Sequence, residues 1–430
     1  MPIPWPQGCG KWSNRICQGF DRNWQAENFL AEEYCPAKRR LIFPPSPTPC
    51  NLPPMAATDA LPEPDCLDGA PHPRATQALF GHAAQEAGFL QAFNSGRLHH
   101  AWMLTGPKGV GKATLAWRIA RLLLATPEDD GGMFAAPPPT SLDIDPAHPV
   151  ARRLRQLSEP RHYLLRRAPN DKETALSQVI SVDEVRKMKS FFALSAADGG
   201  RRTAIIDSLD EMNPAAANAL LKLLEEPPAN VTLLLIAHQP ARLLPTIRSR
   251  CRELRLGPLN PQDLADALTQ AGGEVAPEDR AALAELSGGS VGGAFRLTNL
   301  DGLKLYAALT RLMSTLPRLD RPQALALAEL AGARGAAETF DLIVTLIDLF
   351  LARLARHGAT GQTPPEAAPN EAALLRRLSP DPDAARAWAT LAQTLSARAR
   401  RGKSVNLDPA ALLMDILLHV DETAGSLAQR

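Results

Sequence analysis

The sequence predicts a parallel α/β domain, followed by a short helical segment and an all-helical C-terminal domain. Three apolar runs, at residues 101–104, 203–206 and 231–236, have the length of strands that are covered on both faces. A helix is expected after the first run, and another at 214–224 separates the second run from the third. Strand–helix–strand repeats of this kind form parallel sheets. From residue 260 onwards the pattern is helical.

Length, composition and charge narrow the class of protein. The chain has 430 residues, which is too many for one compact core, and 45% of them are apolar while 22% are charged. The net charge is +1, whereas a protein that grips nucleic acid alone usually has a large basic excess. We therefore expect a member of an assembly. No apolar run is long enough for a membrane span and no apolar signal core is present, so a cytoplasmic protein is expected.

Residues 1–70 differ in character from the rest of the chain. Prolines are dense there, as in the segment 44–49, and such a segment can join neither a helix nor a central strand. We predict a disordered extension, or a start codon placed too early with Met55 as a plausible true start. Five of the six cysteines lie in this region without CxxC spacing, which favours free thiols over a metal site or disulfides.

A phosphate-binding loop is predicted at residues 106–112, where Gly-Pro-Lys-Gly-Val-Gly-Lys fits the pattern GxxxxGK. The loop follows an expected strand and opens an expected helix, which is the context that makes this motif credible. Gly106, Gly109 and Gly111 would let backbone N–H groups close around phosphate oxygens, and Lys112 would reach the β- and γ-phosphates.

The residues that would support hydrolysis are missing from this pattern. A working loop places Ser or Thr after the lysine to hold Mg²⁺, but here that residue is Ala113. Thr114 follows one position later, about 100° around the helix. We include Thr114 with the loop glycines and Lys112 among the residues expected to bind nucleotide. No metal ligand is predicted.

The strand at 203–207 ends on an acidic residue, as a Walker B strand does. Asp207 could lie near a metal, but the next residue, Ser208, stands where ATPases carry a water-polarising Glu. Asp210 and Glu211 follow on the expected turn, where solvated or capping roles are favoured over a role as substitute bases.

Longer segments carry a resemblance to a known family. Residues 217–228 read ANALLKLLEEPP, residues 249–251 read Ser-Arg-Cys, and residues 405–409 read VNLDP. Together they resemble the AAA+ clamp-loader family of bacterial DNA polymerase III, over roughly residues 76–418. The resemblance implies an α/β P-loop AAA+ domain (a parallel sheet flanked by helices) at 71–258, a small helical lid at 259–300 and a C-terminal helical collar for oligomerisation at 301–430.

Within this family the sequence resembles the delta-prime type. The ATP-hydrolysing gamma/tau type keeps its Walker residues and a sensor-2 arginine, and the delta type lacks the Ser-Arg-Cys motif and a recognisable P-loop. In this chain Gly292 stands at the sensor-2 position, and together with Ala113 and Ser208 it indicates delta-prime. Many relatives carry a four-cysteine zinc module after the P-loop helix, but no cysteine lies between Cys66 and Cys251.

The resemblance implies a function without hydrolysis. The chain would join gamma/tau and delta subunits in a hetero-pentamer that loads the sliding clamp on primed DNA, as part of the polymerase holoenzyme, a nucleotidyltransferase. Alone it would not be catalytic, would require no cofactor and would bind ATP or ADP weakly. Arg250 would act in trans on a neighbour's ATP, or else would be a structural arginine at a strand end. The alternatives are an active gamma/tau-type ATPase and an unrelated P-loop ATPase.

Overall fold

The computed structural model describes residues 63, 69–127, 137–170, 175–194 and 200–429. The extension predicted at 1–70 and its five cysteines lie almost wholly outside these residues. Five strands form one sheet in the order β2-β3-β4-β1-β5, and every neighbouring pair is parallel, as predicted. The strands are β1 (Ala101–Thr105), β2 (His162–Arg166), β3 (Arg202–Asp207), β4 (Val231–Ala237) and β5 (Arg252–Arg255).

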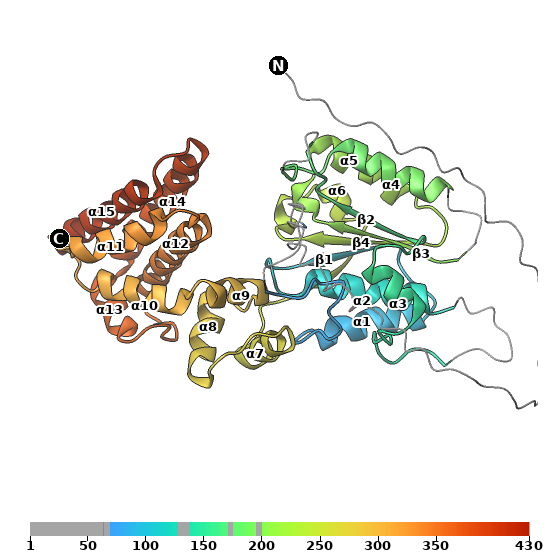
Figure 1. The fold of residues 1–430 in the computed structure, drawn as a ribbon, viewed down its shortest axis with the longest axis horizontal. Helices are drawn as coiled ribbons and strands as arrows, with labels where there is room; N and C mark the ends of the chain where they lie inside the picture. The colour runs from blue at the N-terminus through green and yellow to red at the C-terminus, as the bar shows by residue number, and fades with distance from the viewer. Residues whose placement is uncertain (1–62, 64–68, 128–136, 171–174, 195–199, 430) are drawn as a thin grey trace, which may run out of the picture. The chain divides into compact units, whose positions relative to one another are not determined.

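Helices cover both faces of this sheet (Figure 1). One layer contains α1 (Ala83–Asn94), α2 (Lys112–Ala125) and α3 (Pro149–Arg155), and the other contains α4 (Val182–Leu194) and α5 (Pro214–Glu225). Successive strand residues point to opposite faces. Trp102 and Leu104 of β1 therefore pack in the first layer, while Ala101 and Met103 pack in the second. The predicted α/β fold class is confirmed.

The strands β2 and β5 and the helices α3 and α4 were not predicted from the sequence. In β2 one residue of five is buried and in β5 one of four, because each strand lies at an edge of the sheet. Their sequences, HYLLR and RELR, lack the continuous apolar run that marks a central strand. Helix α4 mixes charged and apolar residues over 13 positions that follow a polar loop.

Arginine side chains hold the first described residues against the α/β domain. The carboxylate of Glu63 pairs with Arg74 at 2.5 Å and with Arg166 of β2 at 3.4 Å. Arg121, which is buried in α2, donates to the backbone oxygen of Thr76 at 2.7 Å. Among the described residues, Glu63 is the first to contact the α/β domain.

The remaining helices follow the sheet, and we keep the names lid and collar for the two ranges predicted from the sequence, 259–300 and 301–430. The lid contains α7 (Pro261–Gln270), α8 (Arg280–Ser287) and α9 (Val291–Asn299), and the collar contains α10 (Gly302–Met313), α11 (Arg321–Gly332), α12 (Ala337–Thr360), α13 (Glu371–Leu378), α14 (Pro382–Ser404) and α15 (Pro409–Ala428). One hydrophobic core runs from Leu259 to Ala424, so the lid and the collar share it. None of the described helices has the length and apolar character that a bilayer span needs.

A buried charge network lies inside this shared core. Arg353 of α12 pairs with the fully buried Glu371 of α13 at 2.7 Å and with Glu285 of α8 at 3.3 Å. The Tyr306 hydroxyl and the backbone N–H of Ala367 also donate to Glu371, at 2.6 and 2.8 Å. Since a buried carboxylate is stable only when paired and hydrogen-bonded, this network fixes α8, α10, α12 and α13 together.

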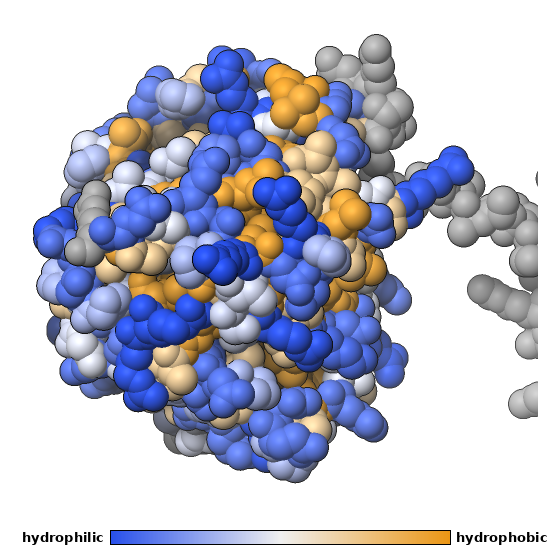
Figure 2. All heavy atoms as spheres, turned by 90° about the vertical axis from the view of Figure 1, so that its left-hand side faces the viewer, coloured by the Kyte–Doolittle hydropathy of each residue, from blue (hydrophilic) through white to orange (hydrophobic). Residues whose placement is uncertain are grey.

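The collar surface is mostly hydrophilic with scattered apolar patches (Figure 2). Leu325 and Leu330 of α11 are 51% and 54% exposed, and Val405 and Leu407, between α14 and α15, are 59% and 55% exposed. Exposed apolar side chains of this kind are ordinary on a protein surface unless they form a contiguous patch.

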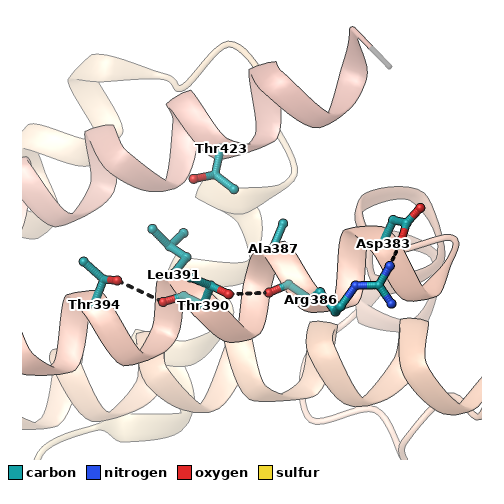
Figure 3. A pocket seen from close by; sticks show the side chains of 7 residues that line it. All are labelled: Asp383, Arg386, Ala387, Thr390, Leu391, Thr394 and Thr423. Atoms are coloured by element: carbon teal, nitrogen blue, oxygen red, sulfur yellow. Dashed lines mark hydrogen bonds and ion pairs between the residues drawn. The ribbon is translucent and has the colours of Figure 1, made fainter.

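A cavity of about 560 Å³ lies between α14 and α15 (Figure 3). It is lined by Asp383, Arg386, Ala387, Thr390, Leu391, Thr394 and Thr423. The three threonine hydroxyls donate to backbone oxygens one helical turn earlier, and Arg386 pairs with Asp383. These polar groups are thus already bonded within their own helices, which leaves few of them to bind a ligand.

Candidate functional site

The predicted phosphate loop lies between β1 and α2, as the motif requires. Gly106, Gly109 and Gly111 have φ values of +140°, +80° and +102°, a region that side chains rarely adopt. A Cβ at Gly106 would collide with the backbone oxygen of Leu256, and one at Gly111 would lie 2.6 Å from the Leu79 side chain. The glycines are therefore needed for packing against the chain itself, whether or not a nucleotide binds.

Lys112 is the first residue of α2 and is only 3% exposed. Its ammonium donates to the backbone oxygens of Gly106 and Pro107 at 2.8 and 2.5 Å. Burial lowers the pKa of Lys112 to about 8, while the charges of Asp207 and Asp210 oppose that effect. The ammonium of Lys112, which is predicted to bind phosphate, thus lies inside the loop. A bound anion would favour the charged form of this lysine.

The first turn of α2 lacks the hydroxyl that would hold Mg²⁺. Ala113 takes that place, and Thr114 lies half-buried one position later. Over the described residues, no group of three or more His, Cys, Asp and Glu side chains is placed to hold a metal ion. At the position that follows the lysine, the loop therefore offers no side-chain oxygen to a magnesium ion.

The Walker-B-like residues lie at the carboxyl end of β3. Asp207 is the last residue of the strand, and Ser208 is 1% exposed, with no hydrogen-bond partner for its hydroxyl within the described chain. Asp210 accepts from the backbone N–H groups of His238 and Gln239 at 2.5 and 2.9 Å. Glu211 pairs with Arg167 at 3.0 Å. Asp210 therefore caps backbone N–H groups after β4, and Glu211 is held in an ion pair.

His238, directly after β4, was not anticipated. Burial and the neighbouring Lys112 lower the pKa of His238 to about 4, so the imidazole is neutral near pH 7. Its only sequence signal is its position at the end of an apolar strand, beside the loop in a parallel sheet.

The lid contacts the phosphate loop directly. Ser290, the N-cap of α9, donates from its hydroxyl to the backbone oxygen of Lys108 at 2.8 Å, and the N–H of Gly292 donates to Gly109 at 3.3 Å. Gly292, the residue that the family resemblance puts at the sensor-2 position, thus lies against the loop. Ser290 was missed because 182 positions separate it from Lys108.

Arg250 lies at the other end of the sheet from this loop. It follows α6 (Pro245–Arg248) and precedes β5, whose Arg252 is level with Trp102, while the loop begins after Thr105. At about 3.3 Å per residue, even Arg252 is roughly 10 Å from the loop end of β1. The structure therefore does not bring Arg250 together with Lys112.

Arg250 has two anchors within its own domain. Its guanidinium pairs with Glu225 at 3.0 Å and donates to the backbone oxygen of Thr246 at 3.0 Å, while its side chain stays 38% exposed. The Ser249 hydroxyl donates to the same oxygen at 3.1 Å, which fixes the turn. Burial raises the pKa of the Cys251 thiol to about 12, so this cysteine is not a nucleophile near pH 7.

Known proteins that are similar to this chain are subunits of DNA polymerase III. Residues 81–260 match the family described as DNA polymerase III, delta subunit. The DNA polymerase III subunit delta' of Escherichia coli is 30% identical over 334 residues, which cover 77% of this chain and 91% of that protein. The Pseudomonas aeruginosa subunit delta' is 39% identical over 154 residues, or 35% of this chain and 41% of that protein.

The chain is also similar to gamma and tau subunits. The subunit tau of Salmonella typhimurium is 31% identical over 54% of this chain and 34% of its own length. A gamma-subunit-related protein of Thermotoga maritima aligns with 78% of this chain and 99% of its own at 16% identity, with a TM-score of 0.33 that supports no further conclusion. The coverage of the E. coli relative decides the family: the chain belongs to the DNA polymerase III delta-prime subunits.

Proposed function

We propose that this chain acts as a non-hydrolysing subunit of the polymerase III clamp loader and supplies Arg250 to the ATP of a neighbouring subunit. The observation that carries the proposal is the position of Arg250. It is partly exposed, anchored by Glu225, and lies at the opposite end of the sheet from its own phosphate loop. This position favours contact with a phosphate on another molecule, where the planar fork of the arginine would neutralise charge that develops in the transition state.

The chain's own loop supports a role without hydrolysis. Ala113 lacks a metal-binding oxygen, and Ser208 lacks the carboxylate that would polarise water. We infer that no nucleotide is required for its function, and that ATP or ADP binds weakly through the loop and Lys112. The active-ATPase alternative draws only on Lys112 and Asp207, which the loop and strand retain.

The partners that we propose are those of the family, and the collar offers a surface for them. In this proposal gamma/tau and delta subunits cover the exposed leucines of the collar, including Leu325 and Leu330, in a ring that acts in the cytoplasm. The sliding clamp and primed DNA would be reached through the complex, which agrees with a net charge of only +1.

The test is a reconstituted clamp loader that carries Arg250→Ala, with Arg248→Ala as a matched control on an exposed arginine of the same turn. An arginine finger contributes roughly 10³–10⁵ in rate at the site where it acts. In a ring with several hydrolysing sites one site loses it, so DNA-stimulated ATPase should fall partially and clamp loading should fall more. Arg250→Lys should rescue poorly, because an ammonium lacks the fork.

Two outcomes would contradict the proposal. Clamp loading at the wild-type rate by Arg250→Ala would make this arginine purely structural. Metal-dependent ATP turnover by the isolated chain that disappears in Lys112→Ala would favour the active-ATPase alternative.

A further inference from the structure

The guanidinium of Arg250 is held by two groups on different elements. One terminal nitrogen lies 3.0 Å from a carboxylate oxygen of Glu225, the last residue of α5, and the other donates to the backbone oxygen of Thr246 in α6. Both side chains remain partly exposed, at 38% for Arg250 and 49% for Glu225. The pair is therefore a surface feature, held between the end of one helix and the turn before β5.

These contacts leave the arginine able to bind a second group. A guanidinium has five N–H donors, and the contacts with Glu225 and Thr246 use one from each terminal nitrogen. One donor on each terminal nitrogen and the donor on Nε remain. Arg250 can thus stay anchored to its own domain while it donates to phosphate oxygens of another chain.

Stability does not explain a carboxylate at this position. Glu225 ends α5, where the helix dipole is negative and favours cations over anions. An ion pair that is half exposed contributes little to folding. A residue that opposes a local preference without a clear gain in stability is expected where function requires it.

We propose that Glu225 is a positioning residue for Arg250, and this inference rests on the proposed trans-acting role of that arginine. A free arginine side chain samples many rotamers, and each productive encounter with a neighbour's phosphate would have to select one of them. The carboxylate of Glu225, with the Thr246 oxygen, selects the orientation before the subunits meet. Groups oriented in advance stabilise developing charge without reorganisation during the reaction.

The chain provides a matched control at the next position. Glu226 is the C-cap residue of α5, is exposed, and has no ion pair within the described part of the chain. Glu225→Gln and Glu226→Gln make the same change in charge at the same helix end. Only Glu225→Gln removes the ionic contact with Arg250.

The experiment measures clamp loading and DNA-stimulated ATPase in the reconstituted complex for both glutamine variants, with and without Arg250→Ala. Thermal melting and co-purification confirm that each subunit folds and assembles. Because the pair is partly exposed, we expect Glu225→Gln to slow loading about two- to five-fold with an unchanged KM for ATP, and Glu226→Gln to match wild type. In the Arg250→Ala background, Glu225→Gln should have no further effect.

The outcomes separate this inference from the proposed function. If Arg250→Ala loads clamps normally, the trans-acting role fails. If Arg250→Ala is slow but Glu225→Gln behaves like Glu226→Gln, the positioning role alone is wrong. An equal loss from Glu225→Gln with and without Arg250 would also overturn it, because the carboxylate would then act through another group.

Discussion

The buried ammonium of Lys112 makes the stability of the protein depend on pH. Its pKa is about 8 in the folded chain, because burial penalises the charge, against about 10.5 in an unfolded chain. Below pH 8 both states hold the proton, and the folded state bears the full cost of the buried charge. Between pH 8 and 10.5 the folded state has released the proton that the unfolded state retains, so stability rises with pH in this window. At pH 7 the cost is about 3 kcal/mol.

The assay compares urea unfolding of the wild type and Lys112→Met at pH 7 and pH 10. The free energy of unfolding of the wild type should rise relative to that of the variant by about 2–3 kcal/mol between these pH values. Lys108→Met, which changes an exposed lysine in the same loop, should follow the wild type. Parallel pH profiles for the wild type and Lys112→Met would refute the assignment of this cost to the buried lysine.

Two further predictions concern the core and the lid. Glu371→Gln leaves Arg353 without its buried carboxylate and should lower the free energy of unfolding by about 3–5 kcal/mol, whereas Asp383→Asn, at an exposed pair, should stay within about 0.5 kcal/mol. Equal urea midpoints for the two variants would contradict this. Ser290→Ala removes the cap of α9 and its bond to Lys108, and should cost about 1–2 kcal/mol; an unchanged midpoint would mean that the lid contact is not stabilising.

The central part of the fold could be predicted because its signals are local. The strands β1, β3 and β4 are continuous apolar runs, and α5 begins at Pro214 after the capping Asn213. The edge strands β2 and β5 lack such runs. Each pairs with a strand on one side only and is exposed to solvent on the other. Their existence depends on pairing with strands distant in the sequence, which no local pattern encodes.

The candidate site was predictable only in part, for a similar reason. The loop residues and Asp207 follow motifs in which spacing and chemistry are linked, so their positions could be stated in advance. The contacts of Ser290 with Lys108 and of Glu225 with Arg250 join segments that come together only in the folded chain. Motifs indicate what a residue type can do, but long-range packing decides which partner it has.

These contacts explain why a phosphate loop without a magnesium ligand still needs its glycines. The lid rests on Gly109, where a Cβ would collide with the Ser290 hydroxyl, and the turn at Gly106 approaches the backbone of Leu256. The same lid shares its hydrophobic core with the collar, and Glu285 of α8 pairs with Arg353 of α12. The loop therefore connects the sheet, through its contacts with the lid, to the helices that we propose form the ring. Because Arg250 is attached to that sheet, the contact between the loop and the lid would help to determine where the arginine meets a neighbouring subunit. This role would remain if the loop had lost its nucleotide chemistry.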